Sequence, residues 1–156
     1  MSQILKFNYY FLPKVCALLH RIWFEYGDPK KQFFNKLLAA HYFLYSLKRS
    51  SDAYCIIDDN AVAGFVLIKR KSKNSRFFMA KVIFKMLGVC LRLFPQCKEG
   101  LKVHDLYAYN YTKLQQGYPT EKYDAEIVLL IIDPKLQGKG LGRKLIEFAI
   151  KKVRKE

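Results

Sequence analysis

The sequence predicts a single domain of the α/β (α+β) class, built on a central sheet of mixed strand directions. Two observations support this prediction. Segments with strand and helix patterns follow one another in the order strand, helix, helix, hairpin, helix, strand, glycine-rich loop and helix. The chain has 156 residues, of which 51% are hydrophobic, so it can bury a core and does not have the composition of a disordered chain. We therefore expect residues 1–156 to form one folded unit.

The N-terminal part is expected to contain one strand and two helices. Residues 3–10 can form the strand, and residues 13–27 carry apolar side chains at helical spacing. A second helix is predicted over residues 28–48. Asp28 is suited to be its N-cap and Pro29 to occupy its first helical position.

A β-hairpin is predicted next. Residues 54–57 and 61–69 have strand character, and the polar segment Asp58–Asn60 between them is typical of a tight turn. Gly64 interrupts the second strand. A glycine weakens a strand interior, so we expect it to mark a bulge or a close approach of another backbone.

The segment from 70 to 118 is expected to be an insertion in this fold. No acidic residue occurs between Asn60 and Lys98, and residues 77–94 predict an amphipathic helix. We expect this helix to pack on the domain or on a second protomer, with a membrane-surface or partner-binding helix as the alternative. The tyrosine-rich residues 101–124 are predicted to form a loop with one short strand. On the predicted helix over residues 77–94, the polar positions lie on one narrow stripe: Lys81, Lys85, Gly88 and Arg92.

Charge and cysteine content limit the function. The net charge of +15 favours a polyanionic ligand, an acidic membrane face or a nucleic acid, and charge alone does not separate them. The four cysteines form no C-x-x-C pair, and no Cys/His set has zinc-site spacing, so we predict no metal site. Reduced thiols and the lack of a signal-peptide pattern predict a cytoplasmic protein.

A glycine-rich loop lies between the last predicted strand and the last helix. Gly138, Gly140 and Gly142 allow backbone N–H groups to converge, and a helix N-terminus adds its dipole, so the loop is suited to bind a phosphate or pyrophosphate. The Walker A and dinucleotide-binding patterns both fail here, because Arg143 stands where each requires a glycine. The surrounding cations are Lys135, Lys139, Arg143 and Lys144.

A third pattern fits this loop. The run Gln137–Gly142 resembles the Q/R-x-x-G-x-G/A motif of the GNAT superfamily of acyl-CoA-dependent N-acetyltransferases. The run "IIDPKLQGKGLGRKL" is similar to that family's fourth strand, Asp-Pro turn and loop, and "NAVAGFVLI" is similar to its third strand. The resemblance covers the chain apart from residues 70–118 and implies a single GNAT-like domain over residues 1–156.

The resemblance implies a site for acetyl-CoA as cosubstrate. Backbone groups of three strand residues would pair with the pantetheine arm, and an N–H near Leu130 would polarise the thioester carbonyl. The loop amides would hold the pyrophosphate, and Lys135, Lys139 or Lys144 would meet the 3′-phosphate unless they are simply solvated. The implied cofactor-binding residues are Leu130, Ile131, Ile132, Gln137, Gly138, Lys139, Gly140, Leu141, Gly142 and Arg143.

Glu126 is the candidate catalytic residue. The run "AEIVLLII" resembles the strand of the histone acetyltransferase branch in which a glutamate acts as general base. An alkylammonium must lose a proton before it attacks a thioester, and amine pKa values near 10 leave little free base at neutral pH. The alternative is a solvent-facing strand glutamate. With Glu121 and Asp124, Glu126 forms an acidic cluster that could receive an ammonium group of the acceptor, whose identity stays open.

The family pattern departs from this sequence at the C-terminal end. The family continues with a fifth strand, a helix that often carries an acidic tyrosine, and a final hairpin. Here the sequence stops at Glu156, which leaves a truncated chain, a missing tail or a partner that completes the sheet, including a homodimer. The leading hypothesis is an N-acetyltransferase acting on an amine. The alternatives are a non-catalytic acyl-CoA-binding or interaction module, or a basic nucleic-acid or membrane-surface protein. We expect neither nucleic acid nor membrane as a partner.

Overall fold

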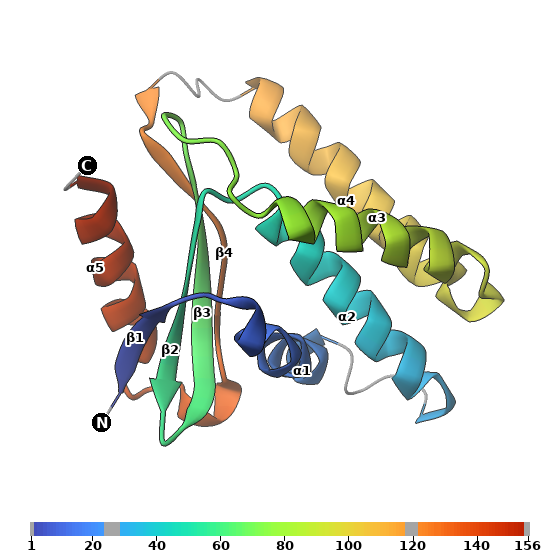
Figure 1. The fold of residues 1–156 in the computed structure, drawn as a ribbon, viewed down its shortest axis with the longest axis horizontal. Coiled ribbons are helices and arrows are strands. Elements are labelled where there is room, and N and C mark those ends of the chain that lie inside the picture. The colour runs from blue at the N-terminus through green and yellow to red at the C-terminus, as the bar shows by residue number, and fades with distance from the viewer. Residues whose placement is uncertain (1, 24–28, 118–121, 155–156) are drawn as a thin grey trace.

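The computed structural model describes residues 2–23, 29–117 and 122–154. A four-stranded sheet in the order β1-β2-β3-β4 separates two helical layers. Helices α1 and α2 cover one face, with α3 and α4 packed outside α2, and α5 covers the other face (Figure 1). The elements are β1 Gln3–Lys6, α1 Leu12–Trp23, α2 Gln32–Leu47, β2 Asp52–Asp58, β3 Ala61–Arg70, α3 Phe78–Arg92, α4 Lys98–Gly117, β4 Ala125–Ile132 and α5 Leu141–Arg154.

The predicted α+β class is confirmed, but the predicted mixture of strand directions is wrong for the described sheet. All three neighbouring strand pairs are antiparallel. Two helices, not one, separate β1 from β2 and β3 from β4. A single crossover helix returns the chain to the opposite end of the sheet and gives a parallel pair. A pair of helices brings the chain back to the end at which it left, and the next strand runs antiparallel.

The N-terminal elements are present with shorter bounds than predicted. Strand β1 has four residues, and a 3₁₀ turn over Tyr9–Phe11 follows it. Helix α2 begins at Gln32, after a 3₁₀ turn over Pro29–Lys31, so Pro29 does not open the α-helix itself. The proposed N-cap Asp28 lies outside the described residues.

The β2–β3 hairpin is confirmed, and its geometry explains Gly64. Asp59 and Asn60 have φ values of 46° and 62°, as a two-residue type I′ turn requires. The register shifts where Ile56 pairs with Gly64 and Ile57 pairs with Val62, which is a bulge on β3. A Cβ atom added at Gly64 would lie 2.5 Å from the Ile131 carbonyl oxygen. Both features that the sequence suggested, the bulge and the close approach, are therefore present.

Hydrophobic side chains fill both sides of the sheet. The larger cluster lies against α1 and α2 and includes Leu18, Phe43 and Phe65, which are almost completely buried. The second cluster lies under α5, where Leu145 packs among side chains such as Val66. Because both faces are covered, side chains of β3 are buried on both sides, which explains its nearly continuous apolar sequence.

The region predicted as a loop over residues 101–124 is largely the helix α4, and this correction has a clear cause. Leu101, His104, Ala108, Tyr111 and Gln115 recur at three- and four-residue spacing and lie on the more buried side of α4. Packing of that side outweighs the modest helix propensity of tyrosine.

The amphipathic helix α3 agrees with its prediction and packs on α2. Its buried residues Ala80, Gly88 and Leu91 face the domain. Within the described parts of the chain, no helix is long and apolar enough to cross a membrane.

Two histidines lie in the interface between α2, α3 and α4. His41 stacks on Phe84 with ring centroids 4.3 Å apart, and its centroid lies 4.7 Å from that of His104. Burial, and secondly the neighbouring His104, lower the pKa of His41 to about 4. Burial also lowers the pKa of His104. Both rings are therefore neutral at pH 7 and serve as core side chains.

We expect this histidine pair to make the fold sensitive to mild acid. The unfolded chain takes up a proton at His41 near pH 6.5, while the folded chain resists until about pH 4. Stability is therefore fully present above pH 6.5 and is lost as the pH falls through this window. His41 alone should cost about 2 kcal/mol of unfolding free energy at pH 5.

Urea unfolding followed by circular dichroism at pH 7.5 and pH 5 measures this loss. The matched variant His41→Phe keeps an aromatic ring against Phe84 but cannot titrate, so it should lose less stability on acidification. An identical pH dependence in both proteins would contradict the assignment to His41.

Candidate functional site

The candidate site begins at β4, which is an edge strand in the described sheet. The Asp133 N–H donates to the Ala63 carbonyl at 2.8 Å, which fixes the residues of β4 that are hydrogen-bonded to β3. In an antiparallel pair every second residue directs its N–H and C=O away from the neighbouring strand. With the observed register, these residues are Leu130 and Ile132, while Ile131 faces Phe65. Two of the three predicted strand residues thus offer backbone groups at the open edge.

A bulge on β4 bends this edge. Leu129 pairs with Leu67 and Ile127 pairs with Ile68, so Val128 is the extra residue. A bulge interrupts the ladder and turns the strand locally. It lies between Glu126 and the open groups of Leu130, which places the turn of the strand in the middle of the candidate site.

The glycine loop follows β4 directly and has the geometry that its glycines predicted. Gly138 and Gly140 have φ values of 81° and 74°, and added Cβ atoms would meet nothing within 4 Å. Glycine is therefore required at these two positions for the positive φ angle and not because a side chain would clash. The first hydrogen bond of α5 runs from the Lys144 N–H to the Gly140 carbonyl at 3.0 Å. The amides of residues 141–143 precede this bond and can face an anion.

Buried contacts hold the loop in place. Asp133 caps the turn that follows β4 by accepting the Lys135 N–H at 3.0 Å, and it also accepts a charged hydrogen bond from Arg21 at the end of α1. Leu141 is buried under the sheet, and an added Cβ at Gly142 would make ordinary contact with Ile132 at 3.5 Å. The loop is thus fixed at both ends, which preorganises its amides.

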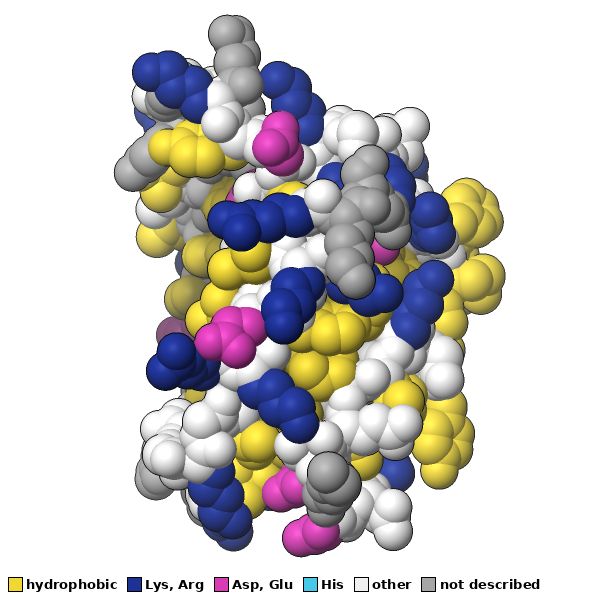
Figure 2. Space-filling model, turned by 90° about the vertical axis from the view of Figure 1, so that its left-hand side faces the viewer, with side chains coloured by type: hydrophobic (Ala, Val, Ile, Leu, Met, Phe, Trp, Pro, Cys, Tyr) yellow, Lys and Arg dark blue, Asp and Glu magenta, His cyan; other side chains and the backbone are white. Residues whose placement is uncertain are grey.

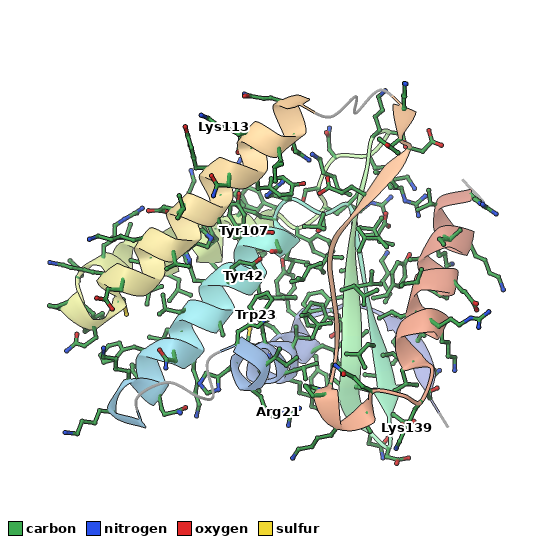
Figure 3. The ribbon with its side chains drawn as sticks, turned by 180° about the vertical axis from the view of Figure 1, so that it is seen from behind. Arg21, Trp23, Tyr42, Tyr107, Lys113 and Lys139 are labelled. Carbon is green, nitrogen blue, oxygen red and sulfur yellow. The ribbon has the colours of Figure 1, made fainter. Side chains whose placement is uncertain are left out.

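The cations around the loop have different partners. The Arg143 guanidinium donates to Glu147 at 2.9 Å on the exposed side of α5, and the Lys144 ammonium donates to the carbonyl and hydroxyl oxygens of Ser2 at 2.8 Å. Lys135 and Lys139 are exposed, and Lys139 extends from the loop (Figure 3). These two lysines are therefore better candidates than Lys144 for a second phosphate.

Glu126 lies at the start of β4 and is held by two side chains of α4. Its carboxylate accepts a very short hydrogen bond from the Tyr111 hydroxyl and a second one from the Gln115 amide nitrogen at 2.9 Å. Gln115 also donates to the Tyr111 oxygen at 2.6 Å. Glu126 is half-buried, so the alternative of a freely solvated strand glutamate does not describe it. Six residues separate it from Ile132, or roughly 20 Å along the strand.

Tyr111 is itself part of a charged network. The Arg49 guanidinium lies over the Tyr111 ring, 3.7 Å from its centroid, and donates to the Tyr45 hydroxyl at 3.1 Å. Burial, and secondly the hydrogen bond to Glu126, raise the pKa of Tyr111 well above its ordinary value. Tyr111 therefore keeps its proton at neutral pH and acts as a donor toward Glu126.

Aromatic side chains continue from this network toward the glycine loop. The rings of Tyr42 and Tyr107 lie 5.4 Å apart, and Trp23 meets Tyr42 edge-on at 4.7 Å. Figure 3 shows Tyr107, Tyr42 and Trp23 in a row on the helical side of β4. Burial, and secondly a hydrogen bond with Tyr107, raise the pKa of Tyr42. This aromatic row can contact the apolar part of an acceptor or of an acyl chain.

Sequence reasoning missed several residues of this site. Tyr111 and Gln115 were assigned to a loop, although their spacing from Leu101 and His104 was a helical signal. Arg21 was not considered, because it meets Asp133 across 112 residues of sequence. Glu121 of the acidic cluster lies outside the described residues.

Other features of the structure do not join the site. A basin of roughly 430 Å³ lies between β1, β2 and the C-terminal half of α5, on the sheet face opposite Glu126. Its lining includes Lys6, Tyr54 and Lys152. The described residues contain no cluster of three or more His, Cys, Asp or Glu side chains that could hold a metal ion, and the four cysteines are free.

The open edge of β4 thus leads directly into the glycine loop, and Glu126 lies near the other end of the same strand. The model of the Acetyltransferase (GNAT) family matches residues 13–156, and the chain belongs to this family. No curated protein matches the chain.

Three solved structures are similar to the chain at low sequence identity, and the first of them shares its fold. Arylalkylamine N-acetyltransferase 2 from Aedes aegypti is 21% identical, with a TM-score of 0.53, over 94% of this chain and 67% of that one. A proposed acetyltransferase from Pyrococcus horikoshii is 16% identical, with a TM-score of 0.48, over 99% and 76% of the two chains. A proposed GNAT acetyltransferase from Desulfovibrio desulfuricans is 11% identical, with a TM-score of 0.43, over 99% and 67%.

Proposed function

We propose that this GNAT-family chain transfers the acetyl group of acetyl-CoA to an amine. The observation that supports this best is the continuous path from the open edge of β4 to the amides of the glycine loop, with Glu126 on the same strand. The path offers hydrogen bonds to an extended amide-containing arm and then an anion site, which is the chemistry of coenzyme A. Glu126 adds a proton acceptor at the other end.

The proposed cofactor contacts follow from the backbone. Leu130 and Ile132 would pair with the amides of the pantetheine arm, and the Leu130 N–H would polarise the thioester carbonyl. Ile131 would contribute its side chain to the core and not its peptide groups, because these face β3. The amides of Gly138–Arg143 would hold the pyrophosphate, with Gln137 at the entry to the loop. Lys135 and Lys139 would meet the 3′-phosphate.

The proposed reaction is direct transfer between two bound reactants. Glu126, directly or through a water molecule, takes one proton from the ammonium form of the acceptor. The neutral nitrogen attacks the thioester carbonyl, the C–N bond forms, and the C–S bond breaks. The second proton lost by the nitrogen passes to the departing thiolate, so that the products are the amide and the coenzyme A thiol, and Glu126 returns its proton to water. Holding both reactants in place supplies much of the rate.

A second candidate function is acyl-CoA binding without turnover. It is favoured by one observation, the hydrogen bonds of Tyr111 and Gln115 to Glu126, which occupy both carboxylate oxygens. Each oxygen keeps a further lone pair, but both hydrogen bonds hold the carboxylate toward α4. In this alternative, the carboxylate serves to connect β4 to α4.

One experiment separates the two candidates. Calorimetry with acetyl-CoA measures binding, and release of free thiol in the presence of an amine panel measures transfer. The panel should include arylalkylamines, because the structurally similar Aedes aegypti protein is an arylalkylamine N-acetyltransferase. Binding with transfer supports the enzyme, binding without transfer supports the second candidate, and no binding contradicts both.

We expect Tyr111→Phe to lower turnover by about tenfold, because loss of one hydrogen bond lets the Glu126 carboxylate leave its position. Affinity for acetyl-CoA should not change. Tyr109→Phe, at an exposed position on α4, is the matched control. Steady-state kinetics measure the effect. Higher turnover in Tyr111→Phe would show instead that this hydrogen bond restrains the base.

We also propose a partner and a location for the chain. A strand from a second copy or another protein can complete the sheet beyond the open edge of β4, with the pantetheine arm between that strand and β4. The free thiols support a cytoplasmic location. The proposed reaction itself requires neither a nucleic acid nor a membrane.

A further inference from the structure

One side of α3 leaves large apolar side chains uncovered. Phe78, Met86 and Leu93 are 71%, 65% and 75% exposed, and Met79 and Val89 are also mostly exposed. At 3.6 residues per turn, these five side chains fall within an arc of about 100°. Adjacent apolar residues of this size rarely stay in water without a partner.

Three exposed cations border this arc. Lys81, Lys85 and Arg92 fall within a neighbouring arc of about 40°, next to Phe78. The opposite side of the helix packs on the domain through Ala80 and Leu91. The exposed side of α3 thus combines an apolar strip with a basic margin. It carries no acidic side chain, because no Asp or Glu occurs between Asn60 and Lys98.

We infer that α3 docks the protein on an anionic lipid surface. Helices that lie in a membrane interface combine an apolar face with Lys and Arg at its border, where the cations meet lipid phosphates while the apolar side chains enter the acyl boundary. The helix has 15 residues and lies parallel to such a surface without crossing it. This inference does not depend on the proposed transferase activity, and it replaces our expectation from the sequence that no membrane is a partner.

Charge favours a lipid surface over a second copy of the chain. Each copy carries a net charge of +15, and contact between two α3 helices would bring two basic margins together. Positive charge alone does not single out α3, because Lys and Arg side chains are also spread over the face that carries α5 (Figure 2). Compared with that face, α3 exposes more large apolar side chains beside its cations, and unlike α4 it carries no acidic residue.

The test uses the 156-residue chain and two kinds of vesicle, phosphatidylcholine alone and phosphatidylcholine mixed with phosphatidylglycerol. Flotation should recover the chain with the anionic vesicles only, and high salt should weaken binding. A triple variant should bind the anionic vesicles at least tenfold more weakly, as measured by its vesicle–water partition coefficient. It changes Lys81, Lys85 and Arg92 to Ala. The matched control changes Lys151, Lys152 and Arg154 of α5 to Ala, which lowers the net charge by the same three units, from +15 to +12, and should weaken vesicle binding far less.

A second variant isolates the apolar strip. Met86→Ser with Val89→Ser keeps the charge and changes only exposed positions, so the fold should survive and vesicle binding should fall at least tenfold. Circular dichroism and light scattering accompany each variant. Four outcomes would overturn the inference. Two concern vesicles: no flotation of the wild-type chain, or equal losses of binding in the two triple variants. The other two are a wild-type dimer that the double variant dissociates, and binding of soluble polyglutamate that is as tight as vesicle binding and is unchanged in the double variant.

Discussion

Glu126→Gln is expected to lower turnover at neutral pH by ~10²- to 10⁴-fold, the usual contribution of a general base. Glutamine has nearly the same size and keeps an oxygen that can accept a hydrogen bond from Tyr111 or Gln115. It cannot accept the proton of an ammonium group. The loss should therefore come from chemistry and not from disruption of the contact between β4 and α4.

The pH–rate profile provides the decisive measurement for this variant. Much of the lost rate should return at high pH, where the amine is deprotonated without help. Acetyl-CoA affinity should stay nearly unchanged, because Glu126 lies roughly 20 Å along β4 from the glycine loop. Glu99→Gln, an exposed position on α4, changes the charge equally and should have no effect. Wild-type turnover of Glu126→Gln at pH 7 would leave Glu126 a structural residue and direct the search to Asp124 or a bound water molecule.

Gly140→Asp is expected to weaken acetyl-CoA binding on the order of 100-fold, which corresponds to about 2.7 kcal/mol. Two effects add. A side chain at φ 74° strains the loop and moves its amides, and a carboxylate repels the pyrophosphate that these amides should hold. Calorimetry measures the affinity, with circular dichroism to verify that the fold persists.

Two further variants separate these effects. Gly140→Ala introduces the strain without the charge and should give a smaller loss. Gly117→Asp adds the same charge at an exposed position of α4, where an added Cβ meets nothing within 4 Å, and should leave binding unchanged. If Gly140→Asp binds acetyl-CoA as tightly as the wild-type chain, the glycine loop is not the anion site.

Different parts of the candidate site were predictable to different degrees. The loop was predictable, because Gly138 and Gly140 adopt positive φ and the helix begins directly after them, as the spacing indicated. The surroundings of Glu126 could not be predicted, because they depend on α4. The tyrosine-rich composition of residues 101–124 indicated a loop where α4 forms. The sequence also could not predict the different contacts of the four cations around the loop, since it shows that a cation is present but not what it contacts. These cations are Lys135, Lys139, Arg143 and Lys144.

The sequence by itself determined the features that depend on short stretches of backbone: the type I′ turn at Asp59–Asn60, the strand–turn–glycine loop–helix unit around Gly140, and the amphipathic character of α3. Local conformational preferences and hydrophobic periodicity are properties of neighbouring residues, so they can be read from one segment. Tertiary structure alone decided the antiparallel pairing of β1 with β2 and of β3 with β4, the Arg21–Asp133 contact and the hydrogen bonds of Tyr111 and Gln115 to Glu126. These depend on which distant segments pack together, and packing is the joint outcome of burying apolar faces across the whole domain.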